Sequence, residues 1–559
     1  MINAALISFK SLIAKKPELS SFTLTLAVSL FLLLFSNYSF WMSLTSILYS
    51  SFKHYILFSI TIFVVVLIYI NTLLTFISFK YIQKPALIVI LISSSFASYY
   101  MNSYGIVIDD HMITSMLETD TQEAFELVHF NLFATVFLLG IVPSIFVYRT
   151  NIKFKRIGPE IFYKLSVVVL SLIILGTSIY PFYQEYASLT RNNRILRHQI
   201  NPANFIHAIR HKVRDLVQDN EIEVQAIGMD ANHVHPVGVA KRSITIFVVG
   251  ETARAKNFSL LGYKRNTNPL MSRQDIVAYS NVKSCGTSTA VSLPCMFSHK
   301  GRRQFSNSDG KRWEGLLDIV SRAGVKVLFR DNNSGCKGVC ARVKTHNMMS
   351  LDISPYCNKG ECYDEILLHK LQEYIQSTKG DLLVVLHQKG SHGPSYYQRY
   401  PKKFNQFVPL CATNQLQNCS KKDISNAYDN TILYTDYFLS KVLTLLKSNA
   451  GDSDGAMIYI SDHGESLGGK GLYLHGLPYM IAPDEQKHVP MILWLSDSFK
   501  LNYGVNYQCL KSGRAKKLSH DNVFHTVLGL TAVKTHLYNK DLDILSNCTN
   551  LSKGAVSEL

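Results

Sequence analysis

The sequence predicts two structural classes in one chain: an α-helical membrane domain of five spans, then an α/β domain with a mostly parallel sheet covered by helices. Three observations carry this prediction. The first 185 residues hold long windows almost free of charge, apolar runs alternate with amphipathic segments after Lys241, and all ten cysteines lie after residue 280. At 559 residues the chain is long enough for two or more domains.

Five windows are long enough to cross a bilayer, which requires about 20 predominantly apolar residues. The first is the weakest, because Asn37 and several serines lie near its end. A cleavable signal peptide is the alternative for it, but no small-residue cleavage site follows and four more spans come after. We place the spans at Phe22–Trp41, Tyr55–Phe79, Pro85–Tyr104, Asn131–Tyr148 and Lys164–Tyr183.

Charge in the short loops sets the orientation, since loops rich in Lys and Arg stay in the cytoplasm. The acidic loop Asp109 to Glu126 then lies outside, and so does everything after Tyr183. We expect a transmembrane domain at 1–183, a bridging segment at 184–240 that is either interfacial or a solvated linker, and an exported domain at 241–559. The basic residues on the cytoplasmic side are Lys10, Lys15, Lys16, Lys80, Lys84, Arg149, Lys153, Lys155, Arg156 and Lys164.

The cysteines agree with export, because an even count in an oxidising compartment predicts disulfides. A zinc site is the alternative for the two closest pairs, but the compartment argues against it. The sequence does not fix the connectivity. Close spacing favours Cys285–Cys295, Cys336–Cys340, Cys357–Cys362 and Cys411–Cys419, leaving Cys509 with Cys548.

The net charge of +17 and the pI near 9.2 have two sources. One source is the excess of Lys and Arg in the cytoplasmic loops. The rest of the positive charge suits a protein that works beside anionic membrane lipids. No nucleic-acid-binding motif is present, so we expect no nucleic-acid partner.

The exported domain shows strand-like and helix-like segments in alternation, which implies a largely parallel sheet covered on both faces. The expected strands are Ile244–Val249, Val325–Phe329, Leu382–Leu386, Ala456–Ile460 and Val489–Leu495. The expected helices include Trp313–Arg322, Tyr363–Gln376 and Ile424–Lys447.

Polar residues come directly after four of these strands, where ligands of open α/β sheets collect. Glu251, Asp462 and His463 offer two carboxylates and one imidazole, a set suited to zinc. Thr289 would complete a tetrahedron and become a nucleophile, because a metal and a helix N-terminus both stabilise its alkoxide. The alternative for Thr289 is a helix N-cap, for which Ser288 and Thr287 compete.

Further residues are candidates for binding a second metal or the transferring phosphate. They are His392, His475, Asn333 and Lys337, with ordinary loop histidines and a solvated lysine as the alternatives. His387 is interpreted as structural.

Four motifs resemble those of the lipid A phosphoethanolamine transferases, a family within the alkaline phosphatase/sulfatase-like superfamily. The resemblance covers essentially the whole chain. It implies a zinc enzyme with Thr289 as nucleophile, Glu251, Asp462 and His463 as metal ligands, and the four residues above as substrate or second-metal contacts. The motifs are Val249-Gly250-Glu251-Thr252-Ala253-Arg254, Gly262-Tyr263-x-Arg265-x-Thr267-Asn268-Pro269, Cys285-Gly286-Thr287-Ser288-Thr289 and Ser461-Asp462-His463-Gly464-Glu465.

The resemblance also implies a cellular location and a reaction. The enzyme would be a monomer in a bacterial inner membrane, with its catalytic domain in the periplasm and one tightly bound zinc, with room for a second. It would move phosphoethanolamine from phosphatidylethanolamine to lipid A through a covalent threonine intermediate, and so confer resistance to cationic peptides such as polymyxin. In the outer loop, Asp110, Thr114 and Glu118 are candidate headgroup contacts or a plain acidic surface, with Ser115 where the family usually has Asn.

Three other functions compete with this one. A phosphoglycerol transferase shares the five spans and the threonine chemistry, but the motif that begins at Val249 favours phosphoethanolamine. A sulfatase would need a Cys/Ser-x-Pro-x-Arg motif, and the nearest match, Ser292-Leu293-Pro294-Cys295-Met296, lacks the arginine. A non-catalytic membrane sensor would be expected to have lost a ligand, and an acceptor other than lipid A stays open.

Overall fold

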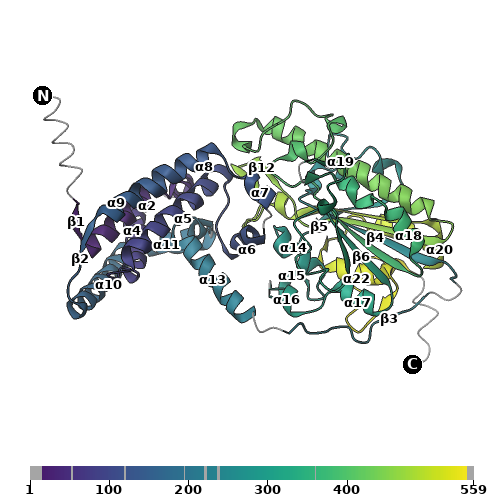
Figure 1. Cartoon of the computed structure of the whole chain (residues 1–559), viewed down its shortest axis with the longest axis horizontal. Helices are drawn as coiled ribbons and strands as arrows, with labels where there is room; N and C mark the ends of the chain where they lie inside the picture. The colour runs from purple at the N-terminus through teal and green to yellow at the C-terminus, as the bar shows by residue number, and fades with distance from the viewer. Residues whose placement is uncertain are drawn as a thin grey trace. The chain divides into compact units, whose positions relative to one another are not determined.

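The computed structural model of the chain describes residues 16–51, 55–118, 121–193, 195–219, 223–235, 239–306, 308–358 and 361–549. Lys10 and Lys15, used above for orientation, lie outside them. The chain divides into two compact units, and Figure 1 colours both along the sequence. The first comprises Met1–Ile113 and Val128–Lys212, and the second comprises Thr114–Leu127 and Val213–Leu559.

The first unit is helical. Four of its described helices are long and apolar enough to cross a membrane: Ile56–Phe76, Gln83–Tyr104, Phe130–Arg149 and Ile157–Asn192. The elements are α2 (Ser21–Phe35), α3 (Tyr38–Ser51), α4 (Tyr55–Phe76), α5 (Gln83–Tyr104), α8 (Phe130–Thr135), a π-helical turn (Val136–Ile141), α9 (Val142–Arg149), α10 (Ile157–Ile179), α11 (Tyr183–Asn192), α12 (Ile195–His198) and α13 (Ala203–Asp219).

The first predicted span is broken rather than continuous. Helices α2 and α3 meet at Ser36 and Asn37 with a bend of 62°. Asn37 exchanges two hydrogen bonds with the backbone of Asn201, each 2.8 Å long, and its amide also donates to the Leu32 carbonyl. Backbone groups freed within a membrane need such internal partners. The polar residue that weakens the apolar window therefore stabilises the break.

Pairing of two short strands fixes which ends of the first unit lie together. Strand β1 (Glu18–Ser20) runs parallel to β2 (Asn151–Lys153), which lies between α9 and α10. The start of α2 thus lies on the same side as the α9–α10 loop. If α4, α5 and α8–α9 each cross once, this parity requires the bent α2–α3 pair to cross as well.

An eight-stranded sheet forms the centre of the second unit, in the order β15-β5-β14-β11-β4-β10-β6-β7. The central strands β11, β4, β10, β6 and β7 are parallel, and β14 is antiparallel to both of its neighbours. This confirms the predicted mostly parallel sheet. The strands are β4 (Arg242–Gly250), β5 (Val277–Lys283), β6 (Lys326–Asp331), β7 (Lys344–Asn347), β10 (Leu382–His387), β11 (Ser453–Ser461), β14 (His488–Leu495) and β15 (Leu518–Ser519).

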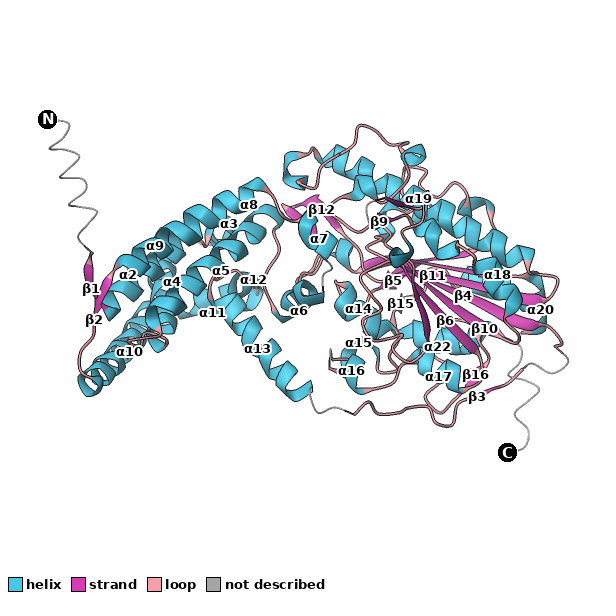
Figure 2. Cartoon of the chain, in the orientation of Figure 1, coloured by secondary structure: helices cyan, strands magenta, loops and turns pink. Residues whose placement is uncertain are grey.

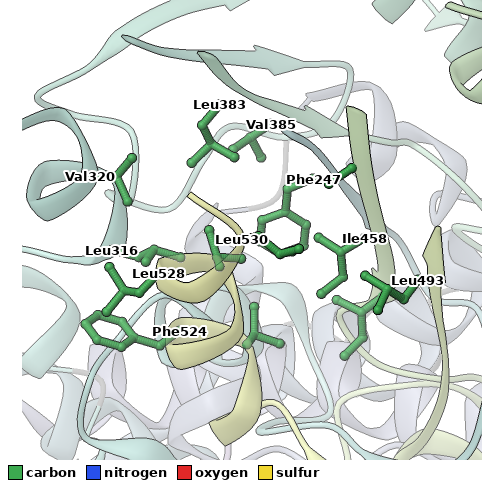
Figure 3. Packing of buried hydrophobic residues seen from close by; sticks show 14 of the residues in the cluster. Phe247, Leu316, Val320, Leu383, Val385, Ile458, Leu493, Phe524, Leu528 and Leu530 are labelled. Carbon is green, nitrogen blue, oxygen red and sulfur yellow. The ribbon is translucent and has the colours of Figure 1, made fainter. Parts of the chain in front are cut away.

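Helices cover both faces of the sheet (Figure 2). Side chains of a strand alternate between faces, and in β4 Phe247 and Val249 join one buried cluster while Ile246 and Val248 join the other. Figure 3 shows Phe247 in the first cluster, with side chains of α17 (Leu316–Arg322) and α22 (Asp521–Leu530). The second cluster includes α18 (Leu371–Ser377) and α19 (Lys421–Ser448).

The remaining described elements of the second unit are short. They are α6 (Asp110–Glu118, which begins in the first unit), α7 (Thr121–Glu126), α14 (Thr289–Met296), α15 (Gly301–Gln304), α16 (Asp309–Arg312), α20 (Asp497–Asn502), α21 (Tyr507–Ser512), and the ribbons β3–β16 (Asn232–His233, Val533–Lys534), β8–β9 (Cys357–Asn358, Glu361–Cys362) and β12–β13 (Ser466–Gly469, Leu472–Leu474).

Five disulfides lie in this unit and use all ten cysteines of the sequence. Four are the pairs that close spacing favours, Cys285–Cys295, Cys336–Cys340, Cys357–Cys362 and Cys411–Cys419, and the fifth is the remaining pair, Cys509–Cys548.

Candidate active site

Two adjacent parallel strands bring three candidate ligands together. Strand β4 ends one residue before Glu251 and β11 ends one residue before Asp462, and Gly250 pairs with Ser461 in the sheet. His463 Nε2 lies 3.3 Å from Glu251 Oε1 and 3.4 Å from Asp462 Oδ2. All three side chains are fully buried, and their ligand atoms form a group that can hold a metal ion.

Backbone groups fix the orientation of the Asp462 carboxylate. Its Oδ1 accepts the N–H groups of Thr252, at 3.1 Å, and of His463, at 2.7 Å. Its Oδ2 is buried and has no hydrogen-bond partner among the described residues. An unsatisfied buried carboxylate oxygen is costly, so this atom is placed to coordinate a cation.

Thr289 lies at the more exposed side of this group. It is the first residue of α14, and Ser288 rather than Thr289 is the N-cap. Its hydroxyl donates to Glu251 Oε2 at 3.0 Å and lies 3.4 Å from His463 Nε2. The hydroxyl is therefore held against the buried group, while the partly exposed residue leaves it open to a substrate.

The electrostatics of the buried group favour a divalent cation. Burial, and then the nearby Glu251 carboxylate, raises the pKa of Asp462 well above its ordinary value. Burial, with the neighbouring His475, lowers the pKa of His463 to about 3. A neutral imidazole between two buried carboxylates is a donor set for a divalent metal, whose charge would hold both carboxylates ionised.

Asn333 follows β6 and contacts the same group. Its amide donates to Glu251 Oε2 at 2.7 Å and to the Gln388 carbonyl at 3.0 Å. His387, at the end of β10, is buried with its Nδ1 2.7 Å from Asp331 Oδ1. Asn333 therefore helps to orient the glutamate, and His387 joins the ends of β6 and β10.

His392 and His475 also lie at the site. The His475 ring is centred 4.3 Å from the His463 ring and 5.5 Å from the His392 ring. His475 Nδ1 lies 3.5 Å from the buried Glu465 carboxylate. His475 therefore lies beside both His463, a member of the ligand group, and His392.

A close backbone approach explains the glycine in the loop that carries His392. Gly390 has φ +55°, and a Cβ there would lie 2.6 Å from the Glu251 carbonyl oxygen. The next residue, Ser391, donates its N–H to that same carbonyl at 3.0 Å. A side chain at position 390 would push the loop away from Glu251.

The predicted roles of four other residues are not tested by these contacts. Lys337 lies between the paired Cys336 and Cys340, and its Nζ donates to the Ser334 carbonyl at 3.0 Å. Asp110, Thr114 and Glu118 belong to α6, and the side chain of Glu118 lies outside the described part. Their roles stay predictions.

The sequence reasoning missed the residues that support the site. Asp364 is buried and accepts the N–H groups of Lys389, at 2.7 Å, and Gly390, at 3.0 Å, so it holds the His392 loop. It lies in no motif, and no local signal identifies it. Glu465 is part of a quoted motif, but its contact with His475 depends on the fold.

One quoted motif is structural. Tyr263 and Arg265 both contact Asp429 of α19, at 2.9 and 2.8 Å. Asn257 donates to the same carboxylate and accepts a hydrogen bond from Arg254. These contacts hold the segment after β4 against α19. Because Glu251 begins this segment, they also help to fix its position.

Comparison with known proteins gives the family. Over 544 residues the chain is 40% identical to phosphoethanolamine transferase EptA of Escherichia coli (strain K12), a match that covers 96% of this chain and 99% of that relative. The chain belongs to the phosphoethanolamine transferase family. Residues 243–533 match the sulfatase family, and residues 66–216 match the family described as phosphoethanolamine transferase EptA/EptB. The resemblance stated from the motifs is confirmed.

Two further relatives extend this finding to the membrane region. The structure of the integral membrane protein lipooligosaccharide phosphoethanolamine transferase A from Neisseria meningitidis superposes with a TM-score of 0.91, at 37% identity, over 95% of this chain and 99% of that chain. Phosphatidylethanolamine transferase Mcr-1 of Escherichia coli is 35% identical over 493 residues, 85% of this chain and 90% of that relative. The chain is a phosphoethanolamine transferase of the inner membrane, with its α/β domain in the periplasm.

Proposed function

We propose that this phosphoethanolamine transferase moves its group from phosphatidylethanolamine to a phosphate of lipid A through a covalent intermediate on Thr289. The observation that carries the proposal is the Thr289 hydroxyl, 3.0 Å from Glu251 and 3.4 Å from His463 at the edge of a buried ligand group. The names of the Mcr-1 and Neisseria relatives support the donor lipid and a lipooligosaccharide acceptor.

Zinc fits the donor set of the site. Glu251, Asp462 and His463 would hold one ion together with Thr289, and two oxygens with one imidazole suit a four-coordinate zinc. When bound, the ion supplies Lewis acidity that lowers the pKa of the threonine hydroxyl. His475, whose ring neighbours His463, and His392, whose ring neighbours His475, are candidates to bind a second ion.

In the first transfer, Thr289 Oγ1 attacks the phosphorus of the phospholipid. A new P–O bond forms to Thr289, and the P–O bond to diacylglycerol breaks. In net terms the hydroxyl proton passes to the diacylglycerol oxygen, which leaves as an alcohol. Glu251 accepts the hydrogen bond that orients the attacking hydroxyl, and Asn333 holds Glu251 in place.

In the second transfer, an oxygen of the acceptor phosphate attacks the phosphothreonine. The bond to Thr289 Oγ1 breaks, and in net terms the proton of the attacking phosphate hydroxyl passes to Thr289 Oγ1. His392 and His475 would face the charge of the transferring group, and Lys337 is a candidate for the same role. Each completed reaction places an ammonium group beside an anionic phosphate of lipid A. The cell surface therefore attracts cationic peptides such as polymyxin less strongly.

The test is mass spectrometry of lipid A from cells that express the wild type, Thr289→Ala or Thr289→Ser. We expect a phosphoethanolamine-sized increment with the wild type and with Thr289→Ser, which keeps the hydroxyl, and none with Thr289→Ala. Polymyxin survival should follow the increment.

Two results would contradict the proposal in different ways. Equal modification of lipid A by the wild type and by Thr289→Ala would show that Thr289 is not the nucleophile. If lipid A were unmodified in all strains and another envelope molecule carried phosphoethanolamine, that molecule would be the acceptor instead of lipid A.

A further inference from the structure

A second group of possible metal ligands lies at the other end of the sheet. His233 is in β3, His235 follows two residues later, and Asp381 comes directly before β10. Asp381 is level with Ser243 at the start of β4, because its Oδ1 accepts the Ser243 N–H. Eight residues of strand separate Ser243 from Glu251, which corresponds to about 26 Å. The two groups are therefore independent.

The ligand atoms of this second group converge. His233 Nε2 lies 3.5 Å and His235 Nε2 2.6 Å from the same oxygen, Asp381 Oδ2. In an extended chain, residues i and i+2 point to the same side, and the two rings are centred 4.5 Å apart. All three ligand atoms lie within 4.8 Å of one another.

A histidine–aspartate hydrogen bond explains only part of this arrangement. It accounts for His235, but His233 Nε2 is buried and has no hydrogen-bond partner among the described residues. The Ser243 N–H holds Asp381 Oδ1, so that Oδ2 turns to the histidines. Metal sites commonly have such a hydrogen bond behind a ligating group.

We propose that His233, His235 and Asp381 bind a divalent transition-metal ion of the zinc class. Two imidazole nitrogens and one carboxylate oxygen are a common donor set for such ions. Ligands about 2.1 Å from a tetrahedral ion are about 3.4 Å apart. The His233–Asp381 separation of 3.5 Å already matches, and the His235 ring, partly exposed, needs to move less than about 1 Å.

The position of the site indicates what the ion does. β3 pairs with β16 in a two-stranded ribbon, and Figure 2 shows the ribbon beside the catalytic domain's helices. This segment leads into β4, which carries Glu251 at its far end. An ion shared between β3 and Asp381 fastens the incoming chain to the sheet. The site is structural, and the proposal does not depend on the catalytic one.

The experiment measures bound zinc in the full-length protein in detergent. Wild type and variants are dialysed against buffered zinc, and the ratio of zinc to protein sulfur is measured by mass spectrometry. His235→Ala removes a partly exposed ligand, and Asp381→Asn keeps an oxygen that can accept the Ser243 N–H. The matched control is His536→Ala, because His536 forms a 2.6 Å pair with Asp230 without a third ligand in the described chain.

We expect His235→Ala and Asp381→Asn each to bind one zinc ion per chain fewer than the wild type, with His536→Ala unchanged. Transferase activity of His235→Ala should stay close to that of the wild type, because the catalytic ligands are intact. Equal zinc content in all four proteins would overturn the proposal. So would a loss in His536→Ala equal to that in His235→Ala, because exposed histidines would then bind zinc without a site.

Discussion

The reactivity expected of Thr289 comes from neighbours that lie far away in the sequence. A threonine hydroxyl is a weak nucleophile in water, and here its oxygen touches Glu251 and His463 from two separate strand ends. Both neighbours are fully buried, whereas Thr289 is partly exposed at the start of α14. This arrangement supports the proposal that the buried residues hold a cation and that Thr289 meets the lipid.

Asn333 offers a test of how the buried group is supported. In Asn333→Ala, Glu251 Oε2 loses a 2.7 Å hydrogen bond, while Glu251, Asp462, His463 and Thr289, the ligands proposed for the first ion, all remain. Removal of such a supporting group costs about 10- to 100-fold in metal affinity or activity. We expect a loss of that size in zinc affinity, measured by competition with a chromophoric chelator, and in kcat/KM.

Asn418→Ala is the control, because Asn418 is an exposed amide whose side chain contacts only Gln415 in the described contacts. A higher KM for the phospholipid with unchanged zinc affinity would contradict the expectation. It would make Asn333 a substrate contact instead, which is the role that the family resemblance implies.

At the scale of single residues, the sequence identifies the polar groups that come directly after a strand. Glu251, Asp462 and His463 each lie just past an apolar run, so their meeting at one edge can be predicted from the parallel sheet. Asp364 could not be predicted, because it acts through the backbone N–H groups of Lys389 and Gly390. Such contacts carry no signature in residue type or spacing.

At the scale of elements, burial on both faces decides which strands are predictable. The five predicted strands are buried along most of their length and read as continuous apolar runs. Strand β5 is fully buried at only three of its seven positions, and β7 is largely exposed. Their sequences contain Ser, Asn, Lys and His, so no apolar run marks them.

Helix boundaries depended on tertiary contacts in the same way. The predicted helix Trp313–Arg322 begins at Leu316, because Gly315 caps it with Asp318 accepting the Gly315 N–H. The predicted span Phe22–Trp41 breaks at Ser36, where Asn201 supplies partners from 164 residues away.

A buried ion pair holds the outer-loop helix α7 against the rest of the second unit. The Arg399 side chain is 1% exposed, and its Nη2 lies 2.8 and 2.7 Å from the two carboxylate oxygens of Glu126. Its Nη1 contacts Glu361, and Asn414 donates to the Glu126 carbonyl at 2.8 Å. The loop segment Thr114–Leu127 is held by these contacts.

Glu126→Gln should loosen this segment. The change leaves the buried Arg399 with a weaker partner, and an unsatisfied buried group costs about 1–3 kcal/mol. Hydrogen exchange measured by mass spectrometry should therefore speed up about tenfold across 114–127, with the central sheet unchanged. Glu373→Gln, at an exposed position of α18, is the control. Unaltered exchange in Glu126→Gln would show that other contacts hold the segment.

At the scale of the whole molecule, the cysteines and the membrane topology are linked. All ten cysteines are paired within the periplasmic domain, so the protein carries no free thiol. Only that compartment is oxidising enough to maintain five disulfides. A cysteine introduced elsewhere would therefore be the sole reactive thiol of the chain.

This property allows the topology to be read directly. We expect Phe125→Cys, in the outer loop, to react with a membrane-impermeant maleimide when only the outer membrane is permeabilised. Tyr81→Cys, in the basic loop between α4 and α5, and Ile157→Cys, at the start of α10 beside the basic α9–α10 loop, should react only after the inner membrane is disrupted. The native side chains at these three positions are at least 76% exposed, so access is limited by the membrane and not by packing.

The side of the membrane on which β1 lies decides whether the bent α2–α3 pair crosses it. Because β1 pairs with β2 beside the α9–α10 loop, Lys16→Cys should behave like Ile157→Cys and stay protected until the inner membrane is opened. Both positions gain the same thiol, and the wild type gives the background signal. Labelling of Lys16→Cys from the periplasm, with Ile157→Cys protected, would make α2–α3 a re-entrant hairpin and would leave only four crossings among the described helices.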